Sequence, residues 1–271
     1  MTIRAKHLAL SLLPERLLLG IKKRHYARTL RTFSHLEERD LEIVSRLVKE
    51  GDQVVDIGAN VGAYTKCLSE FVGETGHVLS IEPVQPTFFI LEYCVKALRL
   101  QNVQICNRAI SDAAATLTME VPPYDEGGEN FYQARIVTDA PSSSLRRVHV
   151  EAVTLDSLVS SLGRPPSFVK CDVEGHELSC IRGATETIGR SRPAWLIEVS
   201  GDPDAQDSAA AALVGVLKES GYEMFWFDGT ALRKRGRGDR SVNYFFLTPQ
   251  HLRSLREKNT VIRDPLSATN S

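Results

Sequence analysis

Apolar residues along this 271-residue chain occur in short runs that alternate with longer amphipathic stretches. A run of about five apolar residues predicts a buried strand, whereas apolar residues three or four apart predict a helix. Their alternation predicts an α/β domain with a mostly parallel sheet and helices on both faces. Strands are expected at 53–57, 77–81, 103–107, 115–121, 148–153, 167–171, 194–199, 222–227 and 242–248. Helices are expected at 40–48, 62–71, 86–99, 155–162, 176–188 and 205–220.

Three segments depart from this alternation and divide the chain. Residues 1–39 predict a basic helical extension ahead of a main domain at 40–250. Within that domain, the stretch 122–147 is rich in Gly, Pro, Ser and acids, which is typical of a binding loop or lid. Residues 251–271 predict a poorly ordered tail. The strand at 242–248 follows no helix, so we expect it to pair antiparallel.

Charge and cysteine content narrow the class of protein. The net charge is −1, but residues 1–31 hold eight Lys or Arg and one Glu, or +7, which leaves −8 for the rest. The five cysteines show no C-x-x-C spacing, so we expect neither a zinc site nor a disulfide framework, in keeping with a cytoplasmic protein. No apolar run approaches the ~18 residues of a membrane span. Pro14, Glu15 and Arg16 interrupt the N-terminal apolar stretch, so no signal peptide is expected.

The most informative motif is the stretch 53–62, where a strand ends in Asp56 and a glycine turn leads into a helix. A dinucleotide site wants Gly-x-Gly-x-x-Gly, which places pyrophosphate on the helix N-terminus. Here the order is Asp-x-Gly-x-x-x-Gly, with Gly58, Ala59, Asn60 and Gly62 in the turn. An acid ahead of the turn repels phosphate but suits a cationic amino-acid group. The motif therefore favours S-adenosylmethionine and resembles motif I of the class I methyltransferases.

A second acid supports the same cofactor. Glu82 and Pro83 end the next expected strand, and Glu82 lies 24 residues after Gly58. A carboxylate at this place can accept hydrogen bonds from both ribose hydroxyls of an adenosyl group. The alternative is that Asp56 only caps the next helix and that Glu82 is a solvated loop acid. Two acids at the ends of consecutive strands favour the cofactor site.

Another cluster of chemical groups covers residues 170–177, where the strand 167–171 ends and a helix begins. Ligands of open α/β sheets bind at the carboxyl ends of the strands, so this cluster is expected beside the glycine turn. Asp172 should point into the crevice, because a buried acid at a strand end usually has a function. His176 has a simpler interpretation as a solvated residue of the first helical turn. Glu177 likewise suits a helix N-terminus through the helix dipole.

These motifs together resemble the FkbM family of S-adenosylmethionine-dependent methyltransferases, over roughly residues 40–200. The residues that carry the resemblance are 55–62, 81–83, 108–112, 153–158, 169–177, 183–184 and 197–198. The block Lys-x-Asp-Val-Glu-Gly-x-Glu is the part specific to this family. Cys171 replaces the usual aliphatic residue, and 122–147 matches only at Ser143, Ser144 and Leu145.

The resemblance implies a fold, an activity and roles for individual residues. The fold would be a Rossmann-like, seven-stranded, mostly parallel sheet. The activity would be methyl transfer to a hydroxyl of a sugar, glycolipid or natural product. Asn107, Ala109 and Ile110 would flank the adenine. Asp172 would be the general base or would orient the acceptor, with Glu174 and His176 as rivals and with Lys170 keeping Asp172 ionised. A metal shared by Asp172 and Glu198 is conceivable, but no spacing demands one.

Several alternatives stay open at this stage. The protein could methylate RNA or protein, although an acidic main domain argues against nucleic acid. It could bind S-adenosylmethionine without catalysis, or use a nicotinamide cofactor, which the glycine pattern opposes. Leu10, Leu13, Leu17 and Ile21 recur at near-helical spacing. This stripe either packs on the main domain or, with the basic residues of 1–31, attaches the protein to an anionic membrane.

Overall fold

The computed structural model describes residues 14–123, 129–137 and 145–265. Within these ranges, nine strands form one sheet in the order β13-β11-β10-β12-β9-β8-β1-β2-β3. Four more strands form a second sheet in the order β4-β7-β5-β6. The main-sheet strands are β1 (Gln53–Ile57), β2 (His77–Ile81), β3 (Val103–Cys106), β8 (Phe168–Cys171), β9 (Ala194–Glu198), β10 (Glu223–Phe227), β11 (Leu232–Lys234), β12 (Asn243–Leu247) and β13 (Ile262–Arg263). The helices are α2 (Glu15–Thr32), α3 (Asp40–Leu47), α4 (Ala63–Val72), α5 (Gln85–Leu98), α6 (Leu155–Val159), α7 (Glu177–Arg182), α8 (Ala209–Glu219) and α9 (Pro249–Glu257).

The main sheet confirms the predicted α/β class and extends the predicted strand count. Strands β3, β2, β1, β8 and β9 pair in parallel, and β12 pairs antiparallel with both β9 and β10, as expected for the last long strand. These seven strands are the predicted ones. The number seven is nevertheless wrong for the whole sheet, because β11 and β13 add an edge beyond β10. Strand β13 comes from the segment expected to be a tail, and β11 comes from the stretch between the strands expected at 222–227 and 242–248.

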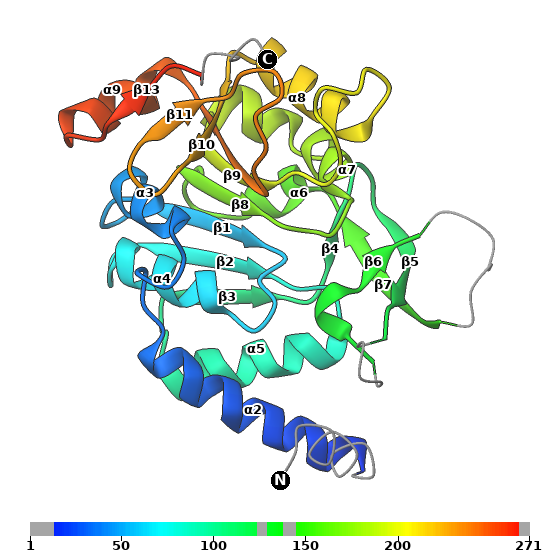
Figure 1. The fold of residues 1–271 in the computed structure, drawn as a ribbon. Helices are drawn as coiled ribbons and strands as arrows, with labels where there is room; N and C mark the ends of the chain where they lie inside the picture. Colours follow the sequence, from blue (N-terminus) through cyan, green and yellow to red (C-terminus); the bar gives the residue numbers. More distant parts are fainter. Residues whose placement is uncertain (1–13, 124–128, 138–144, 266–271) are drawn as a thin grey trace, which may run out of the picture.

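Helices cover both faces of the main sheet because alternate residues of each strand point to opposite sides. Val54 belongs to a core with Leu68 of α4, whereas Val55 belongs to a separate core with Ile181 of α7 and Leu213 of α8. Figure 1 shows the helices on the two sides of the sheet, with the arrowheads of β1, β2 and β3 pointing to one edge. Ligands of such folds bind at that edge.

The second sheet lies beyond the carboxyl ends of β1–β3 (Figure 1). It is made of β4 (Ala109–Ile110), β5 (Ala115–Val121), β6 (Arg135–Ile136) and β7 (Arg146–Val153). The stretch 122–147, expected to be a loop or lid, contains β6 and the short 3-10 helix η1 (Phe131–Gln133). Its residues 124–128 and 138–144, with Ser143 and Ser144, lie outside the described ranges.

Helix α2 packs along α5, which confirms the simpler expectation for the described part of the basic extension. Ala27 and Leu30 are buried against Ile90 and Cys94 of α5. Leu17 and Ile21 belong to the same predicted stripe but are 51% and 41% exposed. Leu10 and Leu13 lie outside the described residues. No helix among the described residues has the length and apolar character to cross a membrane.

The expected poorly ordered tail is wrong for most of residues 251–271. Helix α9 begins with Pro249 behind a capping box in which Thr248 and His251 satisfy each other's backbone groups. Leu252 and Leu255 are buried in the core that contains α3 and α4. The chain then pairs β13 with β11, and residues 266–271 lie outside the described part.

Candidate active site

Two adjoining cavities lie at the edge where β1, β2 and β8 end. The first has a volume of about 80 Å³ and includes Glu82, Pro83, Ala109, Ile110 and Glu174 in its wall. The second has a volume of about 320 Å³ and includes Ala59, Tyr64 and Lys170. Both walls contain Gly58, Asn60, Tyr132 and Asp172, so the cavities meet at the glycine turn.

A close backbone contact within the protein requires glycine at the first glycine position of the turn. Gly58 has a φ of 72°, in the left-handed region, and a Cβ built there would lie 1.7 Å from the carbonyl oxygen of Asp172. A glycine in such a turn can let a ligand approach the main chain. The structure shows instead that the turns after β1 and β8 touch. Gly58 therefore brings the two predicted motifs together.

Two backbone amides hold the Glu82 carboxylate at the wall of the first cavity. Its carboxylate accepts hydrogen bonds from the amides of Asn60, at 3.0 Å, and Val84, at 2.9 Å. Burial raises the pKa of Glu82 to about 7, although these hydrogen bonds and Lys170 oppose the shift. The Asn107 amide donates to the carbonyls of Glu82 and Pro83, so Asn107 shapes the turn that presents the carboxylate.

Asp56 is buried beneath the glycine turn and is absent from the walls of both cavities. The Thr65 hydroxyl donates to one carboxylate oxygen at 2.6 Å, and the other oxygen has no hydrogen-bond partner among the described residues. Lys170 Nζ lies 3.9 Å from that second oxygen, because Asp56 and Lys170 are paired in the register of β1 and β8. Burial raises the pKa of Asp56.

Lys170 lies between Asp56 and Asp172. Its ammonium donates to Asp172 at 3.0 Å and lies 4.8 Å from the centre of the Tyr64 ring. Burial lowers the pKa of Lys170, but Asp172 and Asp56 raise it by more, so the ammonium stays charged. Asp172 is 33% exposed in its side chain and lines both cavities. The predicted pairing of Lys170 with Asp172 is therefore present.

The structure separates the two predicted rivals of Asp172. Glu174 adopts a φ of 53° and lines the first cavity, and burial and the nearby Asp172 charge raise its pKa. His176 lines neither cavity, and its Nε2 lies 2.9 Å from the hydroxyl of Ser111. Burial lowers the pKa of His176. The ring thus fastens the start of α7 to the end of β4, which suits a structural role.

Glu198 ends β9, the strand next to β8, and extends the acidic edge. Burial and then repulsion by Asp172 and Glu174 raise the pKa of Glu198 to about 7. No side-chain hydrogen bond reaches its carboxylate from the described residues, unlike Glu82 or Asp56. Among those residues no group of three or more His, Cys, Asp or Glu is arranged to hold a metal ion.

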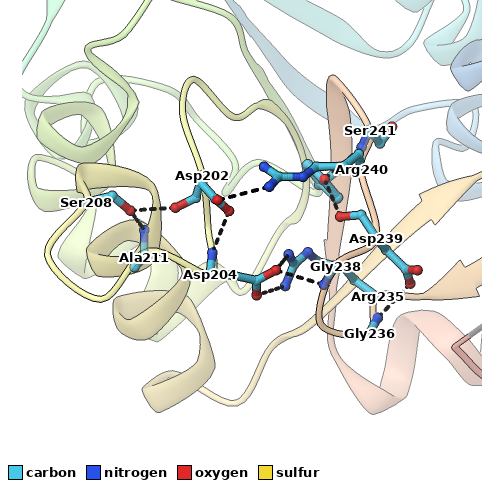
Figure 2. Close-up of polar contacts among 11 residues, drawn as sticks. Asp202, Asp204, Ser208, Ala211, Arg235, Gly236, Gly238, Asp239, Arg240 and Ser241 are labelled. Carbon is cyan, nitrogen blue, oxygen red and sulfur yellow. Dashed lines mark hydrogen bonds and ion pairs between the residues drawn. The ribbon is translucent and has the colours of Figure 1, made fainter. Parts of the chain in front are cut away.

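Two loops beside the main sheet are tied to each other by ion pairs (Figure 2). One follows β9, and the other joins β11 to β12, whose first residue pairs with Glu198. Asp204 of the first loop accepts two hydrogen bonds from the Arg235 guanidinium, at 2.9 and 2.6 Å, and one from the Gly238 amide. Asp202 accepts one from Arg240 at 3.0 Å. We call this set of contacts the loop clamp.

Sequence reasoning missed the aromatic part of the site. Tyr132 and Phe131 come from the stretch treated as a loop, yet Tyr132 lines both cavities and Phe131 lines the first. Tyr64 lies in the first turn of α4 and covers Lys170. The pair Phe131-Tyr132 within a Gly-rich, acidic stretch was the available signal, since exposed loops rarely carry adjacent aromatics without a contact to cover.

Comparisons with known proteins agree on a methyltransferase. The sequence model of the methyltransferase FkbM domain matches residues 56–224. Over 102 residues the chain is 29% identical to protein-L-isoaspartate O-methyltransferase of Methanococcus aeolicus; the match covers 37% of this chain and 43% of that protein. The chain therefore spans less than half the length of this curated relative.

Solved structures of methyltransferases are similar to this chain at low identity. Methyltransferase FkbM from Methylobacillus flagellatus KT is 16% identical, with a TM-score of 0.47 over 72% of this chain and 43% of that one. Fibrillarin of Aeropyrum pernix, solved with natively bound S-adenosyl-L-methionine, is 12% identical, with a TM-score of 0.44 over 74% of this chain and 67% of that one.

Proposed function

Because the chain belongs to the FkbM family of S-adenosyl-L-methionine-dependent methyltransferases, we propose that it methylates a hydroxyl oxygen of a sugar, glycolipid or natural-product acceptor. The observation that carries this proposal is the acidic edge beside the cofactor cavities. Asp172 and Glu174 line the first cavity, and Glu198 ends the adjacent strand. Carboxylates accept hydrogen bonds and protons from hydroxyl groups, and they repel the phosphates of a nucleic acid.

The residues of the two cavities fit S-adenosyl-L-methionine. We assign the ribose to Glu82, whose carboxylate is held at the cavity wall by two amides. Ala109 and Ile110 would flank the adenine. The buried amide oxygen of Asn60 has no hydrogen-bond partner among the described residues, so it is free to accept one from the cofactor's ammonium. When bound, the cofactor supplies an electrophilic methyl group.

The remaining chemistry is the removal of the hydroxyl proton. We assign this step to Asp172, with Glu174 as the nearest rival, since both carboxylates line the first cavity. Lys170 donates a hydrogen bond to Asp172 at 3.0 Å and holds the carboxylate in place. A positioned general base contributes about 10²–10⁴-fold to such a reaction. Asp56 acts through Lys170, because the structure buries it away from the cavities.

Residues 233–240 hold five cations and form the basic turn before β12. This basic turn gives little support to RNA as the acceptor. Four of its five cations are paired within the protein: Arg233 with Asp228, Lys234 with Glu223, Arg235 with Asp204 and Arg240 with Asp202. Paired cations contribute less to phosphate binding, which depends on free positive charge. A hydroxyl group therefore fits this edge better than the phosphate backbone of a nucleic acid.

Methyl transfer from labelled S-adenosyl-L-methionine tests the proposal. The protein is incubated with fractionated cell extracts, and the labelled product is identified by mass spectrometry. We expect an ether methyl group on a small molecule or glycan, lost with Asp172→Asn. Label found in RNA or in protein would contradict the assigned acceptor class. Binding of S-adenosylhomocysteine without transfer in any fraction would favour a non-catalytic module.

Peripheral membrane contact through residues 1–31 is a separate part of the proposal. Arg16, Leu17, Ile21, Arg24 and Arg28 of α2 are exposed, which places apolar and cationic side chains on one helix outside its contact with α5. Each basic residue near an anionic surface contributes ~1 kcal/mol. We expect salt-sensitive sedimentation with anionic vesicles that weakens in the double variant Leu17→Ser, Ile21→Ser. Equal sedimentation with neutral vesicles would contradict this contact.

A further inference from the structure

A third cavity of about 590 Å³ lies between α2, α5 and β7. We call it the α2–β7 groove. Its volume falls within the range of roughly 300–1,000 Å³ that is usual for small-molecule sites. Apolar side chains cover much of its wall, among them Leu18, Leu19, Phe89, Ile90, Val148 and Val150. Of the residues that carry the family resemblance, Pro83 and Arg108 line the groove, but most of its wall comes from α2, α5 and β7.

The groove also carries an excess of positive charge. Arg16, Lys22, Arg108 and Arg146 line it, and among the described residues its wall has one carboxylate, that of Glu151. Arg146 is paired with Glu129. Among the described residues, no carboxylate lies within ion-pair distance of the other three cations. Glu151 accepts a hydrogen bond from Thr116 at 2.9 Å.

Lys22 is the most informative of these cations. Its ammonium lies 5.4 Å from the centre of the Tyr132 ring, and burial lowers its pKa despite the more distant Glu129 charge. A partly buried ammonium without a carboxylate partner loses hydration that it does not recover within the protein. A bound anion would supply the missing partner, and the aromatic ring already favours the cation on its other side.

The groove adjoins the cofactor site. It shares Pro83, Thr87, Arg108 and Phe131 with the first cavity, and Tyr132 lines the groove and both cavities. A molecule in the groove therefore lies against the same tyrosine as one next to Asp172. The acidic edge suits a hydroxyl, and the groove suits an anionic group with an apolar part.

We propose that the α2–β7 groove binds the acceptor, and that the acceptor is an amphiphilic organic phosphate: an apolar chain in the groove, with its phosphate held by Lys22, Arg108 and Arg16. This inference rests on the proposed function, because it is the methyl-transfer reaction that requires the hydroxyl of the acceptor to point towards Asp172. Phosphate is the anion that best matches three cations from two separate segments, because it offers several acceptor oxygens. The apolar wall then selects esters of long-chain alcohols over free phosphate.

Calorimetric titration of the full chain with monomeric dodecyl phosphate tests the site, in the presence of saturating S-adenosylhomocysteine. We expect binding that weakens about tenfold or more in Lys22→Gln and in Arg108→Gln, since each removes one charge-assisted contact. The matched control is Arg28→Gln, which removes an exposed cation of the same helix outside the groove and should leave affinity unchanged. Inorganic phosphate and a neutral dodecyl glycoside should each bind more weakly than dodecyl phosphate.

Three outcomes would overturn the proposal. Equal affinity in the wild type, Lys22→Gln and Arg108→Gln would remove the anion site. Displacement of dodecyl phosphate by S-adenosylhomocysteine would assign the groove to the cofactor. Binding to anionic phospholipid vesicles but not to the monomeric phosphate would make the surface a membrane contact.

The experiments distinguish a failure of the groove proposal from a failure of the proposed methyltransferase function. If extracts yield a methylated product without phosphate, and Lys22→Gln methylates it at the wild-type rate, the groove assignment fails and the methyltransferase stands. If dodecyl phosphate binds in the charge-dependent way described but no fraction accepts a methyl group, the site stands and the acceptor role fails. Unchanged S-adenosylhomocysteine affinity in Lys22→Gln shows that the variant is folded.

Discussion

Four neighbouring strands of the main sheet end in or beside a carboxylate, and each carboxylate meets a different environment. Asp56 is fully buried, and Glu82 is buried but held by amides at the cavity wall. Asp172 is paired with Lys170. The Glu198 carboxylate has a raised pKa and accepts no hydrogen bond from the described residues. The sequence shows four similar acids. Their distinct chemistry comes from burial and partners, which depend on the fold.

Glu82 should make cofactor binding dependent on pH. Its pKa is raised to about 7 by burial, so the free protein holds a proton there below pH 7. Ribose hydroxyls need the ionised carboxylate as acceptor, so affinity for S-adenosylhomocysteine should rise as pH increases through 7. We expect this dependence, measured by calorimetry between pH 6 and 8, to vanish in Glu82→Gln, with affinity lower by about 1.5–3 kcal/mol at pH 8.

The same shift affects stability in the opposite direction. Because the folded-state pKa of Glu82 lies above its ordinary value of 4.5, this group stabilises the fold most below pH 4.5. That contribution is lost as pH rises towards 7. Without ligand, the stability of Glu82→Gln relative to the wild type should therefore increase as pH rises from about 5 to 8, measured by chemical denaturation. A stability difference that stays constant over this range would contradict the burial-driven shift.

Asp172 and His176 should differ in what they contribute. Asp172→Asn keeps the shape but removes basicity, so turnover should fall by about two or more decades with little change in cofactor affinity. His176→Ala should lower stability through the lost contact with Ser111 and leave turnover within about tenfold. The variant Glu198→Gln tests whether Glu198, and not Asp172, is the general base. Loss of activity with Glu198→Gln but not with Asp172→Asn would transfer the role of base to Glu198.

At the scale of elements, sequence patterns predicted the buried parallel strands well. Strands β1 and β2 have the predicted bounds, because each is an apolar run ended by an acid or a turn. The helix expected at 176–188 is instead α7, which stops at Arg182 and is followed by a separate turn of π-helix at Thr187–Ser191. The break is at Gly183, where a Cβ would lie 2.0 Å from the Ser111 carbonyl oxygen. Periodicity within one helix cannot reveal such a distant backbone contact.

The missed elements β11, β13 and α9 have a similar cause. Helix α9 buries only Leu252 and Leu255, and its other residues are largely polar. Strand β11 lies within a basic stretch whose charges are neutralised by acids from other segments, such as Asp228. Propensity is weak evidence when stability comes from tertiary pairing. The two-residue strand β13 exists only because β11 is beside it.

Gly58 provides a test of how the two motifs are joined. Gly58→Ala should be strongly destabilising, because its Cβ would meet the Asp172 carbonyl at 1.7 Å and φ is 72°. The matched control is Gly175→Ala, at a φ of 99° with no atom within 4 Å of the added Cβ. The control should cost only the backbone strain of about 1–3 kcal/mol. Equal losses in urea denaturation would contradict a backbone contact as the reason for Gly58.

At the scale of the whole molecule, the near-zero net charge hides a separation of charge. Exposed cations gather on α2 and the α2–β7 groove, whereas carboxylates gather at the ends of β8 and β9. The sequence revealed the first part through the +7 balance of residues 1–31. It could not reveal that the basic turn before β12 is neutralised by Asp202 and Asp204. Those acids precede their arginine partners by 31 residues for Asp204 and 38 residues for Asp202.

The loop clamp should contribute to the stability of the protein next to the acidic edge. Arg235 is 8% and Asp204 20% exposed in their side chains, and Arg235 makes two hydrogen bonds to that carboxylate. Arg235→Ala should therefore lower the free energy of unfolding by about 1.5–3 kcal/mol, because a poorly hydrated carboxylate loses its charged partner. The control Arg237→Ala removes an exposed cation of the same loop for which the described residues provide no ion pair, and it should change stability by less than about 0.5 kcal/mol.

The pH dependence of the free energy of unfolding tests whether the loop clamp causes the stability difference between the wild type and Arg235→Ala. The hydrogen bonds from Arg235, and then from the Gly238 amide, lower the pKa of Asp204 to about 2. A lowered pKa gives stability that is present above the ordinary value of 3.8 and is lost as pH falls towards 2. The stability gap between the wild type and Arg235→Ala should thus narrow between about pH 4 and pH 2 in denaturation experiments. A gap that stays constant over this range would mean that Arg235 stabilises the edge by packing alone, and that the two loops do not depend on the charge of Asp204.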